Sequence, residues 1–372
     1  MERADIVAEI SVYRYALTYA HGTYAMSNGR EVSVLPSIVV AVTAASGLTG
    51  YGEVCPLGTT YLPGFPGGVV AALEELAPTL LGQDPGRPGA INAAMDRGLA
   101  GHAYAKSVLD IAALDLFGRQ CGLSCSALLG GRRLETFPLY VAVPLGPPAE
   151  MAAFVRAARA GGIHRFQLKI GAEPAHDAER AAAVVEATGD EDVIIADANG
   201  GWRLQDATVA ARLLEALPRL RLEQPCPTIE ECLILRQRTS LPLVLDEVIT
   251  DVHALLRCYE AGAMDAINLK ISRVGGLSRA RVLRDLAQEL GLRITIEDTW
   301  GGDLTSAAVS HLAATSAPEA LYAASFMNDW TLEHVAGYEP RSAEGRGSAP
   351  LGPGLGVEVD QDLLGEPLAR YR

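Results

Sequence analysis

The sequence predicts an α/β protein: a (β/α)8-type barrel, or modified TIM barrel, with an N-terminal α+β capping domain. Two observations support this. Between Lys169 and Asp298, short apolar runs that each end in a charged residue recur at a nearly constant interval. Before them, residues 4–54 alternate in the manner of antiparallel strands and do not share that interval. The repeat therefore indicates the barrel, and the earlier strands indicate a separate domain.

The interval between the charged residues is that of one strand and one helix. The residues that end the runs are Lys169, Asp197, Glu223, Asp246, Lys270 and Asp298. Successive positions differ by 28, 26, 23, 24 and 28 residues, and each interval holds an apolar run and a segment of helical periodicity. Extending the repeat back to 137–143 and forward to 321–326 gives eight units, the number that closes such a barrel.

The flanking segments define three regions. We predict a capping domain over 1–135, the barrel over 136–330, and a C-terminal segment over 331–372 that packs back on the capping domain. In the capping domain, strands are expected from Ala4 to Leu17, over 33–45 and over 48–54, followed by helices at 68–81, 91–98 and 104–119. The stretch 352–360 (GPGLGVEVD) is expected to return as an edge strand.

Composition limits the classes of partner. The 372 residues carry a net charge of −14, which argues against nucleic acid and membrane surfaces as partners. No apolar run approaches the roughly 18 residues that cross a bilayer. The first residues, MERADIVAEI, show no secretion signal. We therefore expect a cytoplasmic protein that acts on a small molecule.

The charges at the strand ends suggest a metal site. Strands of a barrel end on one face, so Asp197, Glu223 and Asp246 should meet there and would repel one another without a cation. Oxygen ligands suit a hard ion such as Mg²⁺. Lys169 precedes this set and Lys270 follows it, so two ammonium groups should flank the ion. A single aspartate at a strand end is often only a helix cap, but three in consecutive units favour the metal.

Several longer motifs resemble a known family. The segments ALDLFGRQCGLSCSALLGG, NLKISRVGG and GPGLGV, in this order, resemble the mandelate racemase and muconate lactonizing branch of the enolase superfamily. The resemblance implies one Mg²⁺ per subunit on Asp197, Glu223 and Asp246, with Mn²⁺ as a substitute. It also implies Lys169 and Lys270 as the acid/base pair, and a homo-oligomer, either a dimer or an octamer.

A closer resemblance concerns the substrate. HGTYAMSNGR, GEVCPLGTTYLPGF and IEDTWGGD are similar to segments of cis-3-hydroxy-L-proline dehydratases and, to a lesser degree, of hydroxyproline-betaine 2-epimerases. The resemblance implies dehydration of cis-3-hydroxy-L-proline to Δ¹-pyrroline-2-carboxylate. The alternative is 2-epimerisation of hydroxyproline betaine, proline betaine or another N-substituted amino acid. Two lysines on opposite faces suit either outcome.

Two departures from the branch bear on the site. Many members of the branch carry a further lysine two residues before the catalytic one. This chain has Gln167 at that position, so an auxiliary charge is lost. The eighth strand reads Ser325-Phe326-Met327-Asn328 and lacks the Asp-x-Asp of dipeptide epimerases, which disfavours a dipeptide substrate.

The substrate ammonium needs negative or aromatic partners, and we expect Asp298 and Trp300 to supply both. Predicted substrate contacts from elsewhere are Phe326 from the eighth strand and Tyr24, Ser27, Leu57 and Tyr61 from two capping loops. Asn199, Asn268 and Gln167 are expected to support the ligands by hydrogen bonding. The alternatives are a helix cap or an ion pair with a lysine for Asp298, and domain packing for the tyrosines. The low aromatic content, 6%, favours a free secondary amine over a betaine.

Overall fold

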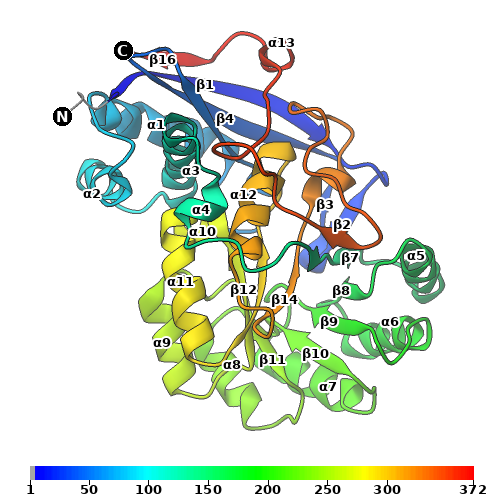
Figure 1. Ribbon diagram of the computed structural model, residues 1–372. Helices are drawn as coiled ribbons and strands as arrows, with labels where there is room; N and C mark the ends of the chain where they lie inside the picture. The colour runs from blue at the N-terminus through cyan, green and yellow to red at the C-terminus, as the bar shows by residue number, and fades with distance from the viewer. Residues whose placement is uncertain (1–4) are drawn as a thin grey trace.

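The computed structural model describes residues 5–372 and shows a barrel covered at one end by a second layer of sheet and helices (Figure 1). Ala4, where the first strand was expected to begin, lies outside the described residues. None of the described helices is long and apolar enough to cross a membrane.

Eight parallel strands form the barrel, in sequence order. They are β7 (Val141–Val143), β8 (Arg165–Lys169), β9 (Val193–Asp197), β10 (Leu220–Glu223), β11 (Leu243–Leu245), β12 (Ala266–Lys270), β13 (Arg293–Glu297) and β14 (Leu321–Ala324). A parallel bridge between Leu139 and Ala324 joins the two outer strands, so the sheet closes on itself. This confirms the fold class that the repeat predicted.

Seven helices cover the outside of the barrel, each after one strand. They are α5 (Pro148–Ala160), α6 (Pro174–Glu186), α7 (Leu204–Leu214), α8 (Ile229–Arg236), α9 (Val252–Glu260), α11 (Leu277–Glu289) and α12 (Asp303–Ala314), with a short α10 (Ile271–Val274) before α11. Three begin at a side-chain cap, which Glu173, Thr228 and Asp251 provide. After β14 the chain makes a short 3-10 helix, Met327–Trp330, and turns back toward the capping sheet.

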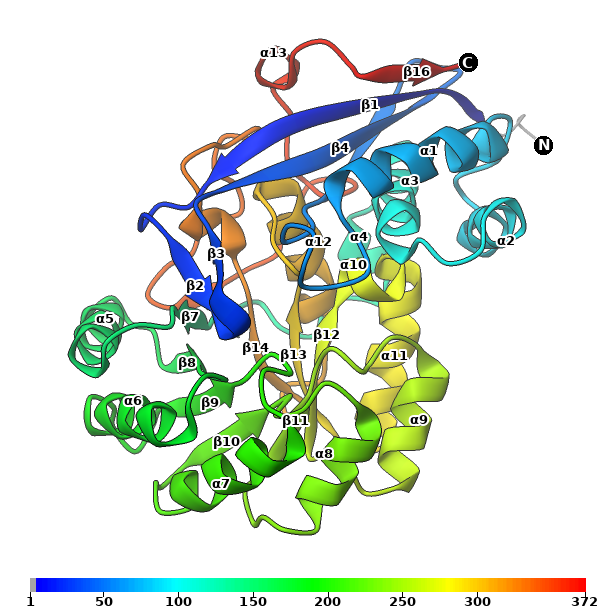
Figure 2. The same cartoon turned by 180° about the vertical axis from the view of Figure 1, so that it is seen from behind.

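The capping sheet is antiparallel and has the order β16-β1-β4-β5. Its strands are β1 (Val7–Thr18), β4 (Val34–Ala44), β5 (Thr49–Val54) and β16 (Ala369–Tyr371). The predicted three-stranded meander is thus present, and Figure 2 shows the last strand returning beside β1. The returning strand is 369–371; residues 352–360 instead run without strand structure and bridge to Ser124 through Gly354.

Smaller elements complete the capping layer. The helices are α1 (Pro66–Leu80), α2 (Pro88–Gly98), α3 (Ala103–Cys121), α4 (Cys125–Leu128) and α13 (Gln361–Leu364). A small ladder pairs β2 (Tyr24–Met26) with β3 (Arg30–Val32) in this layer, and another pairs β6 (Phe137–Pro138) with β15 (Arg346–Gly347) at the opposite end of the barrel, beside the start of β8. The first strand of the β2–β3 hairpin lies within residues 20–30, which were expected to form an open loop. Gly50 and Gly52 let β5 approach α3 closely, since an added Cβ at either position would lie within 2.3 Å of the α3 backbone.

Helix α12 joins the two layers, and every one of its residues is buried. At its start, the Glu53 carboxylate of β5 accepts hydrogen bonds from the backbone N–H groups of Gly302 and Thr305, at 2.9 and 3.0 Å. Near its end, His311 Nδ1 accepts from the backbone N–H of Ser126, and Nε2 lies 3.0 Å from the Leu355 carbonyl. A barrel helix is therefore bonded to both the capping domain and the C-terminal segment. The boundaries at 135 and 330 stay predictions.

Candidate active site

Two lysines face each other across the end of the barrel that the capping domain covers. Lys169 ends β8 and Lys270 ends β12, and these strands are four positions apart in an eight-stranded closed sheet. The lysines therefore lie on opposite sides of the barrel axis. Asp197 ends β9, Glu223 ends β10 and Asp246 follows β11, so the three carboxylates occupy the arc between the lysines. All five side chains are buried.

Each lysine forms an ion pair with one of these carboxylates. The distance from Nζ of Lys169 to Oδ2 of Asp197 is 2.5 Å, and Nζ of Lys270 lies equally close to Oδ2 of Asp246. Burial disfavours the ammonium form, but the neighbouring carboxylate outweighs it and raises the pKa of both lysines. Lys270 also lies 3.3 Å from Oε1 of Glu297.

The carboxylates are crowded enough to hold a metal ion. Glu223, Asp246 and Glu297 offer oxygen atoms that all lie within 4.8 Å of one another. Asp197 is paired in register with Glu223 on the neighbouring strand. Burial, together with the charges of Asp197 and Asp246, raises the pKa of Glu223 well above its usual value. An all-oxygen set of this kind, buried and mutually repelling, fits a hard divalent cation such as Mg²⁺.

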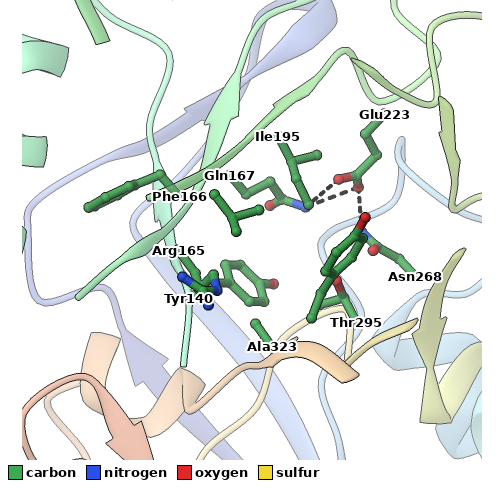
Figure 3. Close-up of a pocket in the computed structure, with 11 residues that line it drawn as sticks. Tyr140, Arg165, Phe166, Gln167, Ile195, Glu223, Asn268, Thr295 and Ala323 are labelled. Atoms are coloured by element: carbon green, nitrogen blue, oxygen red, sulfur yellow. Dashed lines mark hydrogen bonds between the residues drawn. The ribbon is translucent and has the colours of Figure 1, made fainter. Parts of the chain in front are cut away.

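Hydrogen bonds fix the orientation of Glu223. Gln167 Nε2 donates to both of its oxygens, at 3.0 and 3.1 Å, and Asn268 Nδ2 donates to Oε1 at 2.6 Å (Figure 3). Gln167 thus donates to the carboxylate from the position where many members of the branch carry a lysine. The structure places both residues where the sequence analysis expected support for a ligand.

Asp197 and Asp246, the other two predicted metal ligands, are also held in place by hydrogen bonds. The backbone N–H of Asn199 donates to Asp197 Oδ1 at 2.8 Å, while its side-chain amide reaches Tyr61 and Glu247 instead. Arg273, which lies in the NLKISRVGG segment but was not chosen as a site residue, donates to Asp246 Oδ1 at 2.7 Å and is itself buried.

A cavity lies between the lysines and the capping loops. Its wall includes five of the predicted substrate contacts, namely Tyr24, Leu57, Tyr61, Asp298 and Trp300. The other lining residues are Met26, Tyr140, Ala142, Gln167, Lys169, Lys270, Glu297, Thr299, Met327 and Trp330. Residues from both domains therefore enclose the space beside the lysines.

Ser27 and Phe326, predicted as substrate contacts, are not among the residues that line this cavity. Ser27 is fully buried and accepts a hydrogen bond from Arg30, and its Cβ lies where a Cβ on Gly171 would collide with it. Phe326 packs edge-on against Phe137, with 6.0 Å between ring centroids. The wall expected from Phe326 is formed by its neighbour Met327 and by Trp330.

The cavity is richer in aromatic rings than the composition indicated. Trp300 packs edge-on against Tyr24 and Trp330, with centroid separations of 5.1 and 5.8 Å. Tyr61 and Tyr140 add two more rings to the lining. Five of the 15 residues that line the cavity are therefore aromatic. The argument from low aromatic content against a betaine substrate therefore does not hold.

Two adjacent carboxylates at the end of β13 have different surroundings. Asp298, the residue chosen from the sequence, accepts hydrogen bonds from Ser272 and from the backbone N–H of Thr299, and burial raises its pKa to about 7. Glu297, which the sequence analysis missed, points into the barrel. It accepts from the Tyr140 hydroxyl through Oε2 and leaves Oε1 beside Lys270.

The signal for Glu297 was present in the alternation of β13. Ile294 and Ile296 are fully buried in the layer between the sheet and the helices. Because successive side chains of a strand point to opposite faces, Thr295 and Glu297 must point into the barrel. Glu247, Arg273 and Tyr140 carried no comparable signal.

Comparison with known proteins agrees with this geometry. Residues 16–130 match the family described as mandelate racemase/muconate lactonizing enzyme, N-terminal domain. Residues 150–363, more than half of the chain, match the family described as enolase C-terminal domain-like.

Individual relatives cover the full length. The chain is 43% identical to a cis-3-hydroxy-L-proline dehydratase of Roseibium aggregatum, over 98% of this chain and 99% of that protein. It is 28% identical to an N-succinyl-L-Arg/Lys racemase of Bacillus cereus, over 90% of each chain.

Among solved structures, one from Roseovarius nubinhibens ISM, described as a mandelate racemase/muconate lactonizing enzyme complexed with magnesium, superposes with a TM-score of 0.95. It is 34% identical to this chain, over 99% of this chain and all of the other. A structure from Aspergillus oryzae gives a TM-score of 0.93 at 36% identity, over 98% and 99% of the two chains. The protein therefore belongs to the mandelate racemase/muconate lactonizing enzyme branch of the enolase superfamily.

Proposed function

We propose that the protein dehydrates cis-3-hydroxy-L-proline to Δ¹-pyrroline-2-carboxylate with the help of Mg²⁺. The observation that carries the proposal is the placement of two buried lysines on opposite sides of one barrel end. The identity of 43% with a dehydratase of that substrate, over nearly all of both chains, supports the choice of reaction.

The stereochemistry of the substrate requires two groups on opposite faces. In cis-3-hydroxy-L-proline the carboxylate and the hydroxyl share a face of the ring, so the α-hydrogen lies opposite the hydroxyl. Lys169 removes the α-proton, and Lys270 donates a proton to the departing hydroxyl from the other side. The C–O bond breaks, water leaves, and the enamine tautomerises to the cyclic imine. The assignment of the base to Lys169 follows the resemblance.

Asp197, Glu223 and Asp246 would hold the Mg²⁺ ion. Bound there, the cation would stabilise the negative charge that develops on the substrate carboxylate when the α-proton leaves. The residues of the chain prepare the site: Gln167 and Asn268 orient Glu223, and Arg273 orients Asp246. Mn²⁺ is the expected substitute, because it accepts the same oxygen ligands.

The substrate ring would lie in the cavity between the two domains. Glu297 and Asp298 both line it and can face the ring ammonium, and Trp300, Tyr24 and Tyr61 can enclose the ring. The aromatic wall also excludes water from the reacting carbon. Assembly as a dimer or octamer and a cytoplasmic location stay predictions.

A second candidate is 2-epimerisation of a proline betaine or another N-substituted amino acid. The aromatic lining favours it, since aromatic rings bind quaternary ammonium groups. The two lysines suit it as well, because one removes the α-proton and the other returns a proton to the opposite face.

Proton NMR in D₂O distinguishes the two reactions. The Mg²⁺-loaded protein is incubated with cis-3-hydroxy-L-proline, and separately with hydroxyproline betaine and proline betaine. Loss of the hydroxyproline signals with formation of Δ¹-pyrroline-2-carboxylate is the expected result. Exchange of the α-proton without elimination would favour the epimerase. No change in any substrate would refute both reactions on proline derivatives.

A further inference from the structure

The end of the barrel away from the lysines carries an unusual group of charges. Arg165 begins β8, Arg221 is the second residue of β10 and Arg293 begins β13. Tyr322, the second residue of β14, lies with them. Barrel interiors are usually filled by branched apolar side chains. We call Arg165, Arg221, Arg293 and Tyr322 the mouth cluster.

The arginines converge on the single tyrosine. The guanidinium carbons of Arg221 and Arg293 lie 5.1 and 5.5 Å from the ring centroid of Tyr322. Arg221 Nε also donates to the Tyr322 hydroxyl at 3.1 Å. Because β10 and β14 are four strands apart in the closed sheet, the side chains of Arg221 and Tyr322 must meet across the mouth of the barrel.

Arg165 lies at the inner side of this cluster. It lines the same internal pocket as Tyr322, and Figure 3 shows it on the opposite side of that pocket from Glu223. Its Nη1 donates to the His164 carbonyl at 2.9 Å, while its Nε is buried without a hydrogen-bond partner. Two residues before Arg221, the Nη1 atom of Arg219 is also buried without a hydrogen-bond partner.

The three arginines of the cluster form no ion pair within residues 5–372, although the carboxylates of Glu191 and Glu344 line a cavity together with Arg165. Among the same residues, Arg219 reaches only the exposed Asp190, at 3.8 Å. Burial and the charge of Arg221 lower the pKa of Arg165, although Asp192 acts in the other direction. The chain as a whole carries a net charge of −14, so the cluster is a group of cations on an acidic protein.

We propose that the mouth cluster binds a phosphate group, either as free inorganic phosphate or as a phosphate monoester. Guanidinium groups present paired N–H donors that match phosphate oxygens. A doubly charged anion also neutralises more of the three arginines than a carboxylate does.

The test is a calorimetric titration of the Mg²⁺-loaded protein with inorganic phosphate at constant ionic strength. The variants are Arg293→Gln and Arg221→Gln, and thermal unfolding confirms that both are folded. Arg341→Gln is the matched control, because Arg341 also lies over a tyrosine, with its guanidinium carbon 4.9 Å from the ring centroid of Tyr338. We expect saturable binding that weakens at least tenfold in both mouth variants and is unchanged in the control.

Two results would overturn the proposal. One is the absence of saturable binding by phosphate and by glycerol 3-phosphate alike. The other is binding of equal strength in wild type and in both mouth variants, which would place the anion at the metal end of the barrel. If binding is confirmed, tighter binding of glycerol 3-phosphate would identify a metabolite as the source of the phosphate group, and tighter binding of inorganic phosphate would identify the free anion.

Discussion

The hydroxyl of Tyr61 lies 3.1 Å from Nζ of Lys270, and so joins a capping loop to a lysine of the barrel. The same hydroxyl donates to Glu247 at 2.7 Å and accepts from Asn199. Its ring centroid is 5.5 Å from the ammonium nitrogen. The capping domain therefore helps to orient one of the two lysines that we propose as acid and base.

We predict that Tyr61→Phe lowers kcat by about ten- to a hundredfold, since a hydrogen bond to a charged group contributes roughly 1.5–3 kcal/mol. The measurement is the steady-state rate with cis-3-hydroxy-L-proline. Tyr51→Phe is the control, because the Tyr51 hydroxyl also accepts a close hydrogen bond, from Gln361 within the capping layer. Equal activity of wild type and Tyr61→Phe would show that Lys270 is oriented without the loop.

Substitution of the two lysines should affect exchange of the α-proton differently. Lys270→Ala should keep exchange of the α-proton in D₂O but lower elimination by about a hundred- to ten-thousandfold, the usual contribution of a general acid. Lys169→Ala should lower both. The measurement is the NMR time course, with Mg²⁺ binding as the check on the site. The reverse pattern would exchange the two roles.

The third carboxylate ligand of the ion, beside Glu223 and Asp246, is either Asp197 or Glu297. Glu297 is a candidate because its oxygen lies as close to Glu223 and Asp246 as that of a ligand would. Asp197→Asn should weaken Mg²⁺ binding by about a hundredfold, as expected for loss of a charged ligand in a buried site. Glu297→Gln should leave it within about threefold, because the proposed function places Glu297 beside the substrate ammonium and not on the ion. Calorimetric titration with MgCl₂ measures both. A larger loss in Glu297→Gln would make Glu297 the ligand.

His311 should make stability depend on pH. Burial lowers its pKa to about 4, from 6.5. Between pH 4 and pH 6.5, His311 is therefore protonated in the unfolded chain and neutral in the native chain. The free energy of unfolding is therefore not reduced by His311 above pH 6.5. It decreases as the pH falls from 6.5 toward 4, by about 3 kcal/mol in total.

Urea unfolding at pH 7.5 and pH 5 measures this effect. His311→Gln should be less stable at pH 7.5 but should lose less stability on going to pH 5. His253→Gln, which alters an exposed histidine on α9, should behave like wild type. An identical loss in all three proteins would assign the pH dependence to other groups.

The barrel could be predicted because apolar runs that end in a charged residue recur in the sequence at a nearly constant interval. Leu168 and Ile296 alternate with charged residues in short strands, and this pattern places Lys169 and the metal carboxylates at one end without knowledge of the fold. The capping meander was equally legible, because antiparallel strands joined by tight turns are local structures.

Contacts between segments distant in the sequence could not be predicted in the same way. Tyr140 bonds to Glu297 across strands that only the closed sheet brings together, and Arg273 of α10 bonds to Asp246 at the end of the neighbouring strand β11. Glu297 was missed for a different reason. Glu297 and Asp298 are both carboxylates at a strand end, and only the alternation of β13 shows which one faces the barrel.

Helix α12 has consequences for how this protein can be altered. Since Glu53 bonds to its first turn and His311 to the C-terminal segment, the helix is a common part of the core of both domains. The two domains should therefore unfold in a single transition. A capping domain transplanted from a relative would need a matching α12, so the natural unit of exchange between members of this family is the capping domain together with this helix.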